Sequence, residues 1–177
     1  YFKFWVADWF ALMNNKMDGD LDKIHTVGEY FIEVWKACGM DLKNVEFVWA
    51  ADSMNQDYWL SVLKIARLNT VNRITRCSQI MGRSESDSLS AAQIFYPVMQ
   101  AADIFHLKVD IAQLGMDQRK VNVLAREVAP KLGLKKPIAI HHHMLMGLTE
   151  PKAEGLSGVD AAIAKKMSKS NPDSAIF

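Results

Sequence analysis

The chain has 177 residues, half of them hydrophobic, and a formal net charge of only +1. That length and apolar content suffice for one compact domain with a core, and the nearly balanced charge excludes a protein whose whole surface attracts nucleic acid. The two cysteines, Cys38 and Cys77, lie far apart without a CxxC pair, which excludes a disulfide framework and fits a reducing, cytoplasmic compartment. The sequence contains no signal peptide and no apolar stretch long enough to cross a membrane.

In the first half of the chain, short apolar runs alternate with stretches of helical spacing. We expect strands at residues 3–7 and 45–50, because both are apolar runs bounded by polar residues. Elsewhere in this half the apolar residues recur every three or four positions, which predicts helices over residues 8–17, 21–39, 57–68 and 73–82.

The second half continues this alternation after a polar, turn-like segment at residues 82–88. A helix is expected over 89–107, where Pro97 should kink the helix or mark its first turn. The elements predicted after it are a strand at 109–115, a helix at 116–133, a strand at 137–142 and a Gly-rich loop at 147–162. Strands separated by helices predict an α/β fold with a doubly wound parallel sheet.

Three polar side chains follow helical spacing inside the otherwise apolar segment 89–107. Tyr96, Gln100 and Asp103 stand at positions i, i+4 and i+7, so they share one helix face. Buried polar groups without partners are costly, so this face predicts either a polar ligand or an internal network. The alternative is a surface helix on which all three side chains are solvated.

A second group of candidate residues follows the strand at 109–115. In parallel sheets ligands bind beyond the carboxyl ends of the strands, which here means residues 115–118 and 141–147. Gly115 permits close approach of a ligand to the backbone, Asp117 can accept from the hydroxyls of a ribose, and Gln118 can donate and accept. This pattern is weak alone, because many turns between a strand and a helix contain Gly and Asp.

The third group is the pentapeptide "KMSKS" at residues 166–170. Its lysines, Lys166 and Lys169, supply mobile positive charge, and its serines add hydroxyl donors. This combination suits a triphosphate and the negative charge of a departing pyrophosphate, stabilised by a loop that can close. The alternative is a solvated basic loop.

Together these segments resemble one family. "KMSKS" is similar to a signature of class I aminoacyl-tRNA synthetases, and "YPVMQAAD" (96–103) resembles the YxxxQxxD helix of tyrosyl-tRNA synthetases. "GMDQRKVNVLARE" (115–127), "VADWFALMN" (6–14) and "HHHMLMGL" (141–148) look like the archaeal and eukaryotic cytosolic type. The resemblance spans the whole chain and implies a Rossmann-like catalytic domain that activates L-tyrosine with ATP for transfer to tRNA(Tyr).

The resemblance also implies roles on the tyrosine side of the site. Tyr96 and Gln100 would contact the α-amino group of the substrate, and Gln118 would also contact the amino acid. Asp103 would accept a hydrogen bond from the phenolic hydroxyl. Ala7 would line the pocket.

On the nucleotide side, the resemblance implies that Gly115 and Asp117 hold the ribose of ATP. Lys166 and Lys169 would be catalytic, stabilising the phosphates as the tyrosine carboxylate attacks the α-phosphorus. The remaining residues expected at ATP are Met144 and Leu145 beside the adenine and Met167, Ser168 and Ser170 in the loop. Mg²⁺ would arrive with ATP, and no protein-bound metal is expected.

We expect residues 1–177 to be part of a longer protein, because the chain begins without Met and ends within a pattern. The class I signature HxGH is absent and would precede Tyr1, and an anticodon-binding domain would follow Phe177. Within the chain, residues 85–110 would form the dimer-side insertion and tyrosine-binding helix, and 147–177 the KMSKS loop region. The family resemblance implies a homodimer or a tandem pseudo-dimer.

Two alternative functions remain open at this point. A tryptophanyl-tRNA synthetase would share the fold, although the face with Tyr96, Gln100 and Asp103 argues against it. A non-catalytic, synthetase-like module could bind nucleotide or tRNA. A zinc site at His141–His143 is disfavoured, because neighbouring strand residues point to opposite faces and no carboxylate or cysteine completes a set.

Overall fold

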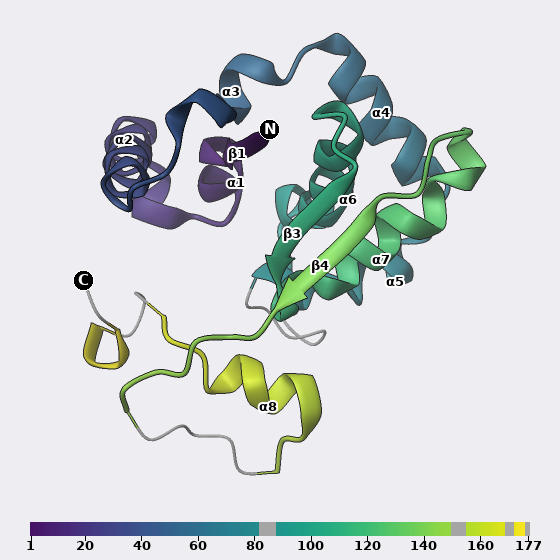
Figure 1. Cartoon of the computed structure of the whole chain (residues 1–177). Coiled ribbons are helices and arrows are strands. Elements are labelled where there is room, and N and C mark those ends of the chain that lie inside the picture. The colour runs from purple at the N-terminus through teal and green to yellow at the C-terminus, as the bar shows by residue number, and fades with distance from the viewer. Residues whose placement is uncertain (82–87, 150–154, 169–171, 176–177) are drawn as a thin grey trace. The chain divides into compact units, whose positions relative to one another are not determined.

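The computed structural model describes residues 1–81, 88–149, 155–168 and 172–175. The chain divides into two compact units, Tyr1–Lys108 and Val109–Phe177, and each is described here by itself. Figure 1 shows both units with their elements labelled.

The first unit contains a parallel pair of strands, β1 (Phe2–Val6) and β2 (Val45–Trp49). The crossover between them contains α2 (Leu21–Ala37), which is the arrangement that parallel neighbours require. Phe4 of β1 stacks on Phe47 of β2 at 5.5 Å and on Trp35 of α2 at 4.7 Å between ring centroids. These aromatic contacts attach α2 to the strand pair.

Helices make up the rest of this unit. They are α1 (Asp8–Met13), α3 (Ala50–Ser53), α4 (Gln56–Arg67), α5 (Val71–Thr75) and α6 (Ala91–His106), with 3₁₀ turns at Lys16–Gly19, Leu42–Asn44 and Ser78–Met81. α4 and α6 pack against each other, and their buried residues include Tyr58, Val62 and Ile65 on α4 and Val98 and Met99 on α6.

The start of α6 is defined by a capping box. The Ser90 hydroxyl accepts from the Gln93 backbone N–H at 3.3 Å, and the Gln93 side chain accepts from the Ser90 backbone N–H at 3.1 Å. Two backbone donors that the helix itself leaves unpaired are thereby satisfied. Pro97 lies inside the helix and not in its first turn, so the capping box and not the proline defines where α6 begins.

Replacing Ser90 with Ala should destabilise α6, because the Gln93 backbone N–H loses its acceptor. We expect a loss of about 1 kcal/mol in the free energy of unfolding. Thermal unfolding of the full-length protein should show a midpoint lowered by about 2–4 °C. Ser90→Thr keeps the hydroxyl and is the matched control; an equal drop in both variants would contradict the capping role.

The second unit contains another parallel pair, β3 (Ile111–Gly115) and β4 (Ile138–His142). The crossover between them contains α7 (Arg119–Val128), whose residues Val121, Leu124 and Val128 are fully buried. The remaining elements are α8 (Gly158–Ala164) and 3₁₀ turns at Met116–Gln118, Pro130–Leu132 and Pro172–Ser174.

The predicted strands are confirmed to within two residues at each end, both strand pairs are parallel, and the α/β composition holds. The helical predictions need five corrections, the first being that the short helix α3 (Ala50–Ser53) is not among the predicted helices. Segments 8–17 and 73–82 each divide into a short helix and a 3₁₀ turn, 116–133 keeps a helix only at Arg119–Val128, and the loop at 147–162 gives way to α8 from Gly158. Periodicity does not mark where a regular helix stops, and Ala-rich sequence favours helix in α8.

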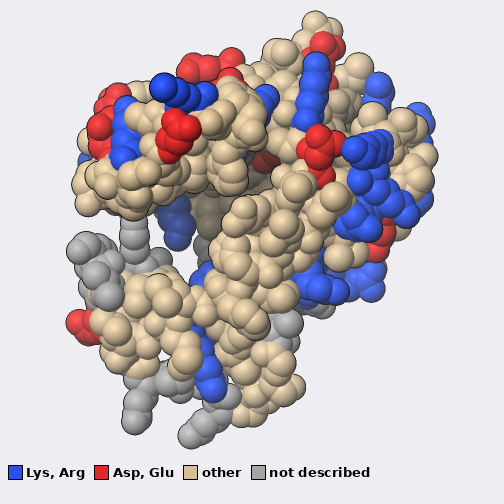
Figure 2. Space-filling view, in the orientation of Figure 1, with Lys and Arg blue, Asp and Glu red and all other residues tan. Residues whose placement is uncertain are grey.

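Acidic and basic side chains are mixed on the surface of α2 (Figure 2). Over α2 in Figure 2, acidic and basic side chains alternate, and ion pairs such as Lys36–Glu33 at 2.7 Å join some of them. An interleaved surface of this kind gives α2 no net attraction for a polyanion. Among the residues that the structure describes, no helix is long and apolar enough to cross a membrane.

Candidate functional site

In the first unit, the three polar residues predicted to share a helix face lie on α6. Asp103 is buried at 6% exposure, whereas Tyr96 and Gln100 are half-buried. The Tyr96 ring packs edge-on against Phe10 of α1, with centroids 4.9 Å apart. The face therefore runs from a buried carboxyl group to partly accessible polar groups, as a pocket for a polar ligand requires.

The Asp103 carboxyl group is held by a residue from another helix. The Tyr58 hydroxyl of α4 donates to Asp103 Oδ1 at 2.9 Å. Burial raises the pKa of Asp103 well above its usual value, while the Tyr58 hydroxyl and the Trp5 indole oppose this rise. The Trp5 indole nitrogen is buried and has no hydrogen bond of standard geometry. The Tyr58 hydroxyl is therefore the group that forms a well-defined hydrogen bond with Asp103.

Ala7 lies where β1 passes into α1. It is exposed and occupies the N-cap position of that helix. The next residue, Asp8, accepts through Oδ1 from the backbone N–H groups of Trp9 at 2.8 Å and of Ala51 at 3.1 Å. This carboxylate links the ends of the two strands of the first unit and fixes the backbone that presents Ala7.

In the second unit, Gly115 ends β3 and is followed by the 3₁₀ turn that contains Asp117 and Gln118. A Cβ atom at Gly115 would lie 2.7 Å from Asp117 Oδ1 and 3.4 Å from Met144 Sδ. The missing side chain therefore lets Asp117 and Met144 approach the strand end. Of the residues predicted to contact a nucleotide, the structure brings these three together.

Lys166, the first lysine of "KMSKS", contacts the cluster at the end of β3. Lys166 Nζ donates to Asp117 Oδ2 at 2.8 Å, with side-chain exposures of 32% and 11%. Its backbone is held by pairing with the segment after β4, where Met167 N–H donates to Leu145 O at 2.7 Å and Gly147 N–H donates to Lys165 O at 2.9 Å. Lys166 is thus held by its side chain at Asp117 and by main-chain pairing at the segment after β4.

The other predicted residues of this loop are placed only in part. Met167 and Ser168 are half-buried, and the Ser174 hydroxyl donates to the Ser168 carbonyl at 3.3 Å. Leu145 is 70% exposed. Lys169 and Ser170 lie outside the described residues.

Of the three consecutive histidines at the end of β4, His141 is half-buried and the other two are exposed. His141 Nε2 lies 2.9 Å from Asn122 Nδ2 on α7, and burial followed by the charges of Arg119 and His142 lowers the His141 pKa. Asn122 is almost completely buried, and its side-chain oxygen has no hydrogen-bond partner. Within the described ranges, no group of three His, Cys, Asp or Glu residues converges on a possible metal position.

Sequence reasoning missed Tyr58 and Asn122, which hold predicted or neighbouring site residues in place. A signal for Tyr58 exists, because it stands at i, i+4 and i+7 with Val62 and Ile65 on the buried face of α4. A hydroxyl on such a face needs an internal partner. Nothing in the sequence names that partner.

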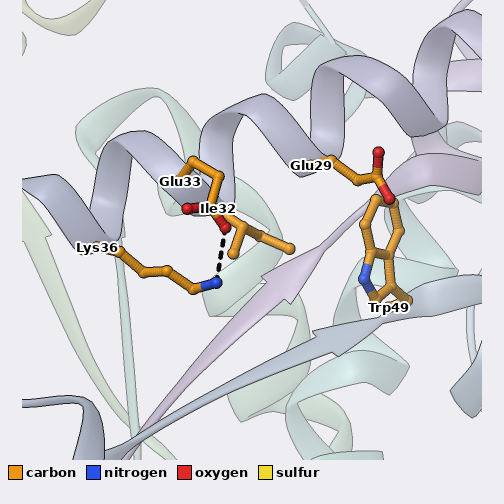
Figure 3. A pocket seen from close by; sticks show the side chains of 5 residues that line it. All are labelled: Glu29, Ile32, Glu33, Lys36 and Trp49. Atoms are coloured by element: carbon orange, nitrogen blue, oxygen red, sulfur yellow. Dashed lines mark hydrogen bonds and ion pairs between the residues drawn. The ribbon is translucent and has the colours of Figure 1, made fainter.

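A separate hollow of about 390 Å³ lies between α2 and the end of β2. Figure 3 shows Glu29 beside the Trp49 ring and Lys36 bonded to Glu33. None of the predicted site residues lines it, and the charge of Glu33 is already met by Lys36. The hollow therefore offers little to a charged ligand.

Comparison with known families gives one match along almost the entire chain. Residues 2–177 match the family described as "tRNA synthetases class I (W and Y)". The cytoplasmic tyrosine–tRNA ligase 1 of Arabidopsis thaliana is 58% identical over 99% of this chain and 43% of its own length. The tyrosine–tRNA ligase of Picrophilus torridus is 45% identical over 97% of this chain and 50% of its own, so the chain spans about half of these relatives.

Solved structures agree with these matches. The tyrosyl-tRNA synthetase of Leishmania major in complex with tyrosinol is 53% identical, with a TM-score of 0.86 over 99% of this chain and 25% of that one. The Pyrococcus horikoshii tyrosyl-tRNA synthetase complexed with L-tyrosine is 40% identical, with a TM-score of 0.87 over 99% and 52%. A tryptophanyl-tRNA synthetase from Encephalitozoon cuniculi, 21% identical with a TM-score of 0.65, shares the fold.

Proposed function

This chain belongs to the class I tRNA synthetases of the W and Y type, and on that premise we propose that the full-length protein is a tyrosine–tRNA ligase. It would activate L-tyrosine with ATP to tyrosyl-adenylate and transfer the tyrosyl group to tRNA(Tyr). The observation that carries the proposal is the buried Asp103 carboxyl group on α6, an acceptor in apolar surroundings suited to a phenolic hydroxyl. The relatives that are 45–58% identical support tyrosine over tryptophan.

For tyrosine, we assign recognition to two regions of the chain. On α6, Asp103 accepts from the phenolic hydroxyl, while Tyr96 and Gln100 bind the α-amino group. Gln118 adds a polar contact to the amino acid, and Ala7 lines the pocket with a side chain too small to obstruct it. Positioning by these groups replaces an encounter in solution with a bound geometry.

For ATP, we assign recognition to the cluster in the second unit. Asp117 accepts from the ribose hydroxyls beside Gly115, and the backbone at Met144 and Leu145 borders the adenine. Lys166 stabilises the charge that develops on the phosphates when the tyrosine carboxylate attacks the α-phosphorus and pyrophosphate leaves. Lys169, with Met167, Ser168 and Ser170, completes this loop in the proposal. Mg²⁺ enters with ATP, held by phosphates and water.

The cellular location and the acceptor tRNA are assigned from the names of the relatives. The cytoplasmic ligase of Arabidopsis supports a cytoplasmic location, and tRNA(Tyr) is the expected acceptor. We also propose that the full-length protein acts as a homodimer or tandem pseudo-dimer.

The proposal is tested by amino-acid-dependent pyrophosphate exchange on the full-length protein with tyrosine, tryptophan and phenylalanine. We expect exchange with tyrosine. Exchange with tryptophan alone would identify the other specificity of the family. No exchange with any of the three would indicate a non-catalytic binding module.

Replacing Gly115 with Ala tests the nucleotide cluster. The backbone at Gly115, with φ −68° and ψ 160°, accepts any residue, so the fold should persist. The added Cβ would lie 2.7 Å from Asp117 Oδ1 and would displace that carboxylate from its position. We expect the KM for ATP in the exchange assay to rise about tenfold, because roughly one hydrogen bond to a charged group is lost.

The KM for tyrosine and the thermal midpoint serve as controls for Gly115→Ala, and both should stay near the values of the unsubstituted enzyme. An unchanged KM for ATP would contradict the assignment of Asp117 to the ribose.

A further inference from the structure

A tyrosine on α4 lies directly behind the Asp103 carboxyl group. The Tyr58 side chain is fully buried, and its hydroxyl lies 2.9 Å from Asp103 Oδ1. A side chain without accessible surface cannot touch a ligand, so Tyr58 would act on a substrate through its neighbours, and among them Asp103 is the residue assigned to the substrate hydroxyl. Resting on the proposed function, we propose that Tyr58 is a positioning residue for tyrosine selection, holding Asp103 Oδ1 so that Oδ2 receives the phenolic hydroxyl.

The hydroxyl of Tyr58 can bond Asp103 in either protonation state. Its oxygen also lies 3.2 Å from the Met99 carbonyl, so one hydroxyl proton faces two acceptors. If Asp103 is ionised, Tyr58 donates to Oδ1. If Asp103 is protonated, its carboxyl O–H donates to Tyr58 and Tyr58 donates to Met99. The contact that orients Asp103 therefore persists through its titration.

The Tyr58 ring itself is held from two sides. It packs edge-on against Trp59, with centroids 5.6 Å apart, and against His106, with centroids 5.2 Å apart. His106 is fixed in turn, because its Nε2 lies 2.8 Å from the Ser53 hydroxyl. A ring packed in this way places its hydroxyl reproducibly, which is what orienting a neighbouring carboxyl group requires.

The two oxygens of Asp103 differ in their partners. Oδ1 accepts from Tyr58, whereas within the described residues no hydrogen bond of standard geometry reaches Oδ2; the Trp5 indole nearby also lowers the Asp103 pKa. Burial raises the pKa of Asp103, and the hydrogen bond from Tyr58 works against that rise. Tyr58 thus occupies one oxygen and favours the ionised carboxylate, which leaves Oδ2 to accept a hydrogen bond.

This arrangement bears on selectivity more than on general binding. Phenylalanine has no hydroxyl, so it gains nothing from an oriented Asp103. Tyrosine gains a hydrogen bond whose strength depends on the position and charge of Oδ2. Loss of the Tyr58 hydroxyl should therefore weaken tyrosine and leave phenylalanine nearly unchanged.

The test is Tyr58→Phe in the full-length protein, which keeps the packed ring and removes only the hydroxyl. In pyrophosphate exchange, kcat/KM for tyrosine should fall about tenfold through a higher KM, while kcat/KM for phenylalanine stays within about twofold. The ratio of the two is independent of how much enzyme is folded. Tyr30→Phe makes the same chemical change at a residue that is 61% exposed on α2, and it should change neither value.

A double substitution separates action through Asp103 from a structural effect. In an Asp103→Asn background, Tyr58→Phe should cause no further loss of selectivity. An additional loss there, or equal losses for tyrosine and phenylalanine in the single variant, would overturn the role of Tyr58. Unchanged selectivity in Tyr58→Phe would overturn the role of Tyr58 and leave the proposed function standing. Absence of tyrosine-dependent exchange in the unsubstituted enzyme would overturn both.

Discussion

Asp103→Ala is expected to lower discrimination between tyrosine and phenylalanine by roughly 10- to 100-fold, the range for one lost hydrogen bond to a charged group. A site that bonds a hydroxyl rejects the analogue lacking it because its own buried polar group would be left unpaired, and tyrosyl-tRNA synthetases are themselves the standard example of this effect. Without the carboxyl group of Asp103, a buried residue on α6, that penalty against phenylalanine disappears. The measurement is kcat/KM for both amino acids in pyrophosphate exchange.

Asp57→Ala provides the control for Asp103→Ala. Asp57 is an exposed carboxylate in the first turn of α4, away from the buried face that packs on α6. Its removal should leave the ratio between tyrosine and phenylalanine unchanged. If the ratio of kcat/KM for tyrosine to that for phenylalanine is also unchanged in Asp103→Ala, another residue must select for the hydroxyl.

Lys166→Met is expected to lower the rate of adenylate formation by about 100-fold or more, the scale for removing one preorganised group that stabilises charge in a transition state. Methionine keeps much of the length of the side chain and removes its charge. Lys166 Nζ donates to Asp117 Oδ2 at 2.8 Å, so removing the lysine also leaves that carboxylate available to the ribose. The KM for ATP should therefore change much less than kcat.

The adjacent lysine offers a matched control for Lys166→Met. Lys165 is exposed, and its backbone carbonyl, not its side chain, takes part in the pairing with Gly147. Lys165→Met should leave kcat within about twofold in single-turnover measurement of adenylate formation. A large rise in the KM for ATP with an unchanged kcat in Lys166→Met would place Lys166 in ground-state binding instead.

The strands and the α6 helix were predictable because their signals are local. Short apolar runs and a helical period depend on neighbours in sequence, and the spacing of Tyr96, Gln100 and Asp103 places them on one helix whatever surrounds it. Helix ends were less predictable. The Ala-rich stretch of α8 looked like a continuation of a Gly-rich loop, and the regular part of α7 stops at Val128, just before a 3₁₀ turn that begins at Pro130.

The partners of the site residues were not predictable from local patterns. The bond between Tyr58 and Asp103 joins residues 45 positions apart, and the bond between Lys166 and Asp117 joins residues 49 positions apart. Each exists because packing brings two elements together, α4 with α6 in one unit and the segment after α8 with the end of β3 in the other. The spacing of apolar residues along the sequence does not indicate which distant element will pack against a given helix or strand.

By itself, then, the sequence determined which chemical groups are available and which elements carry them: a carboxyl group on an apolar helix, a glycine and an aspartate after a strand, and a lysine in "KMSKS". The tertiary structure decided how those groups are held. It buried Asp103 and bonded it to Tyr58, and it paired Lys166 with Asp117. The physical reason is that burial and long-range hydrogen bonds arise only when distant segments exclude water from one another.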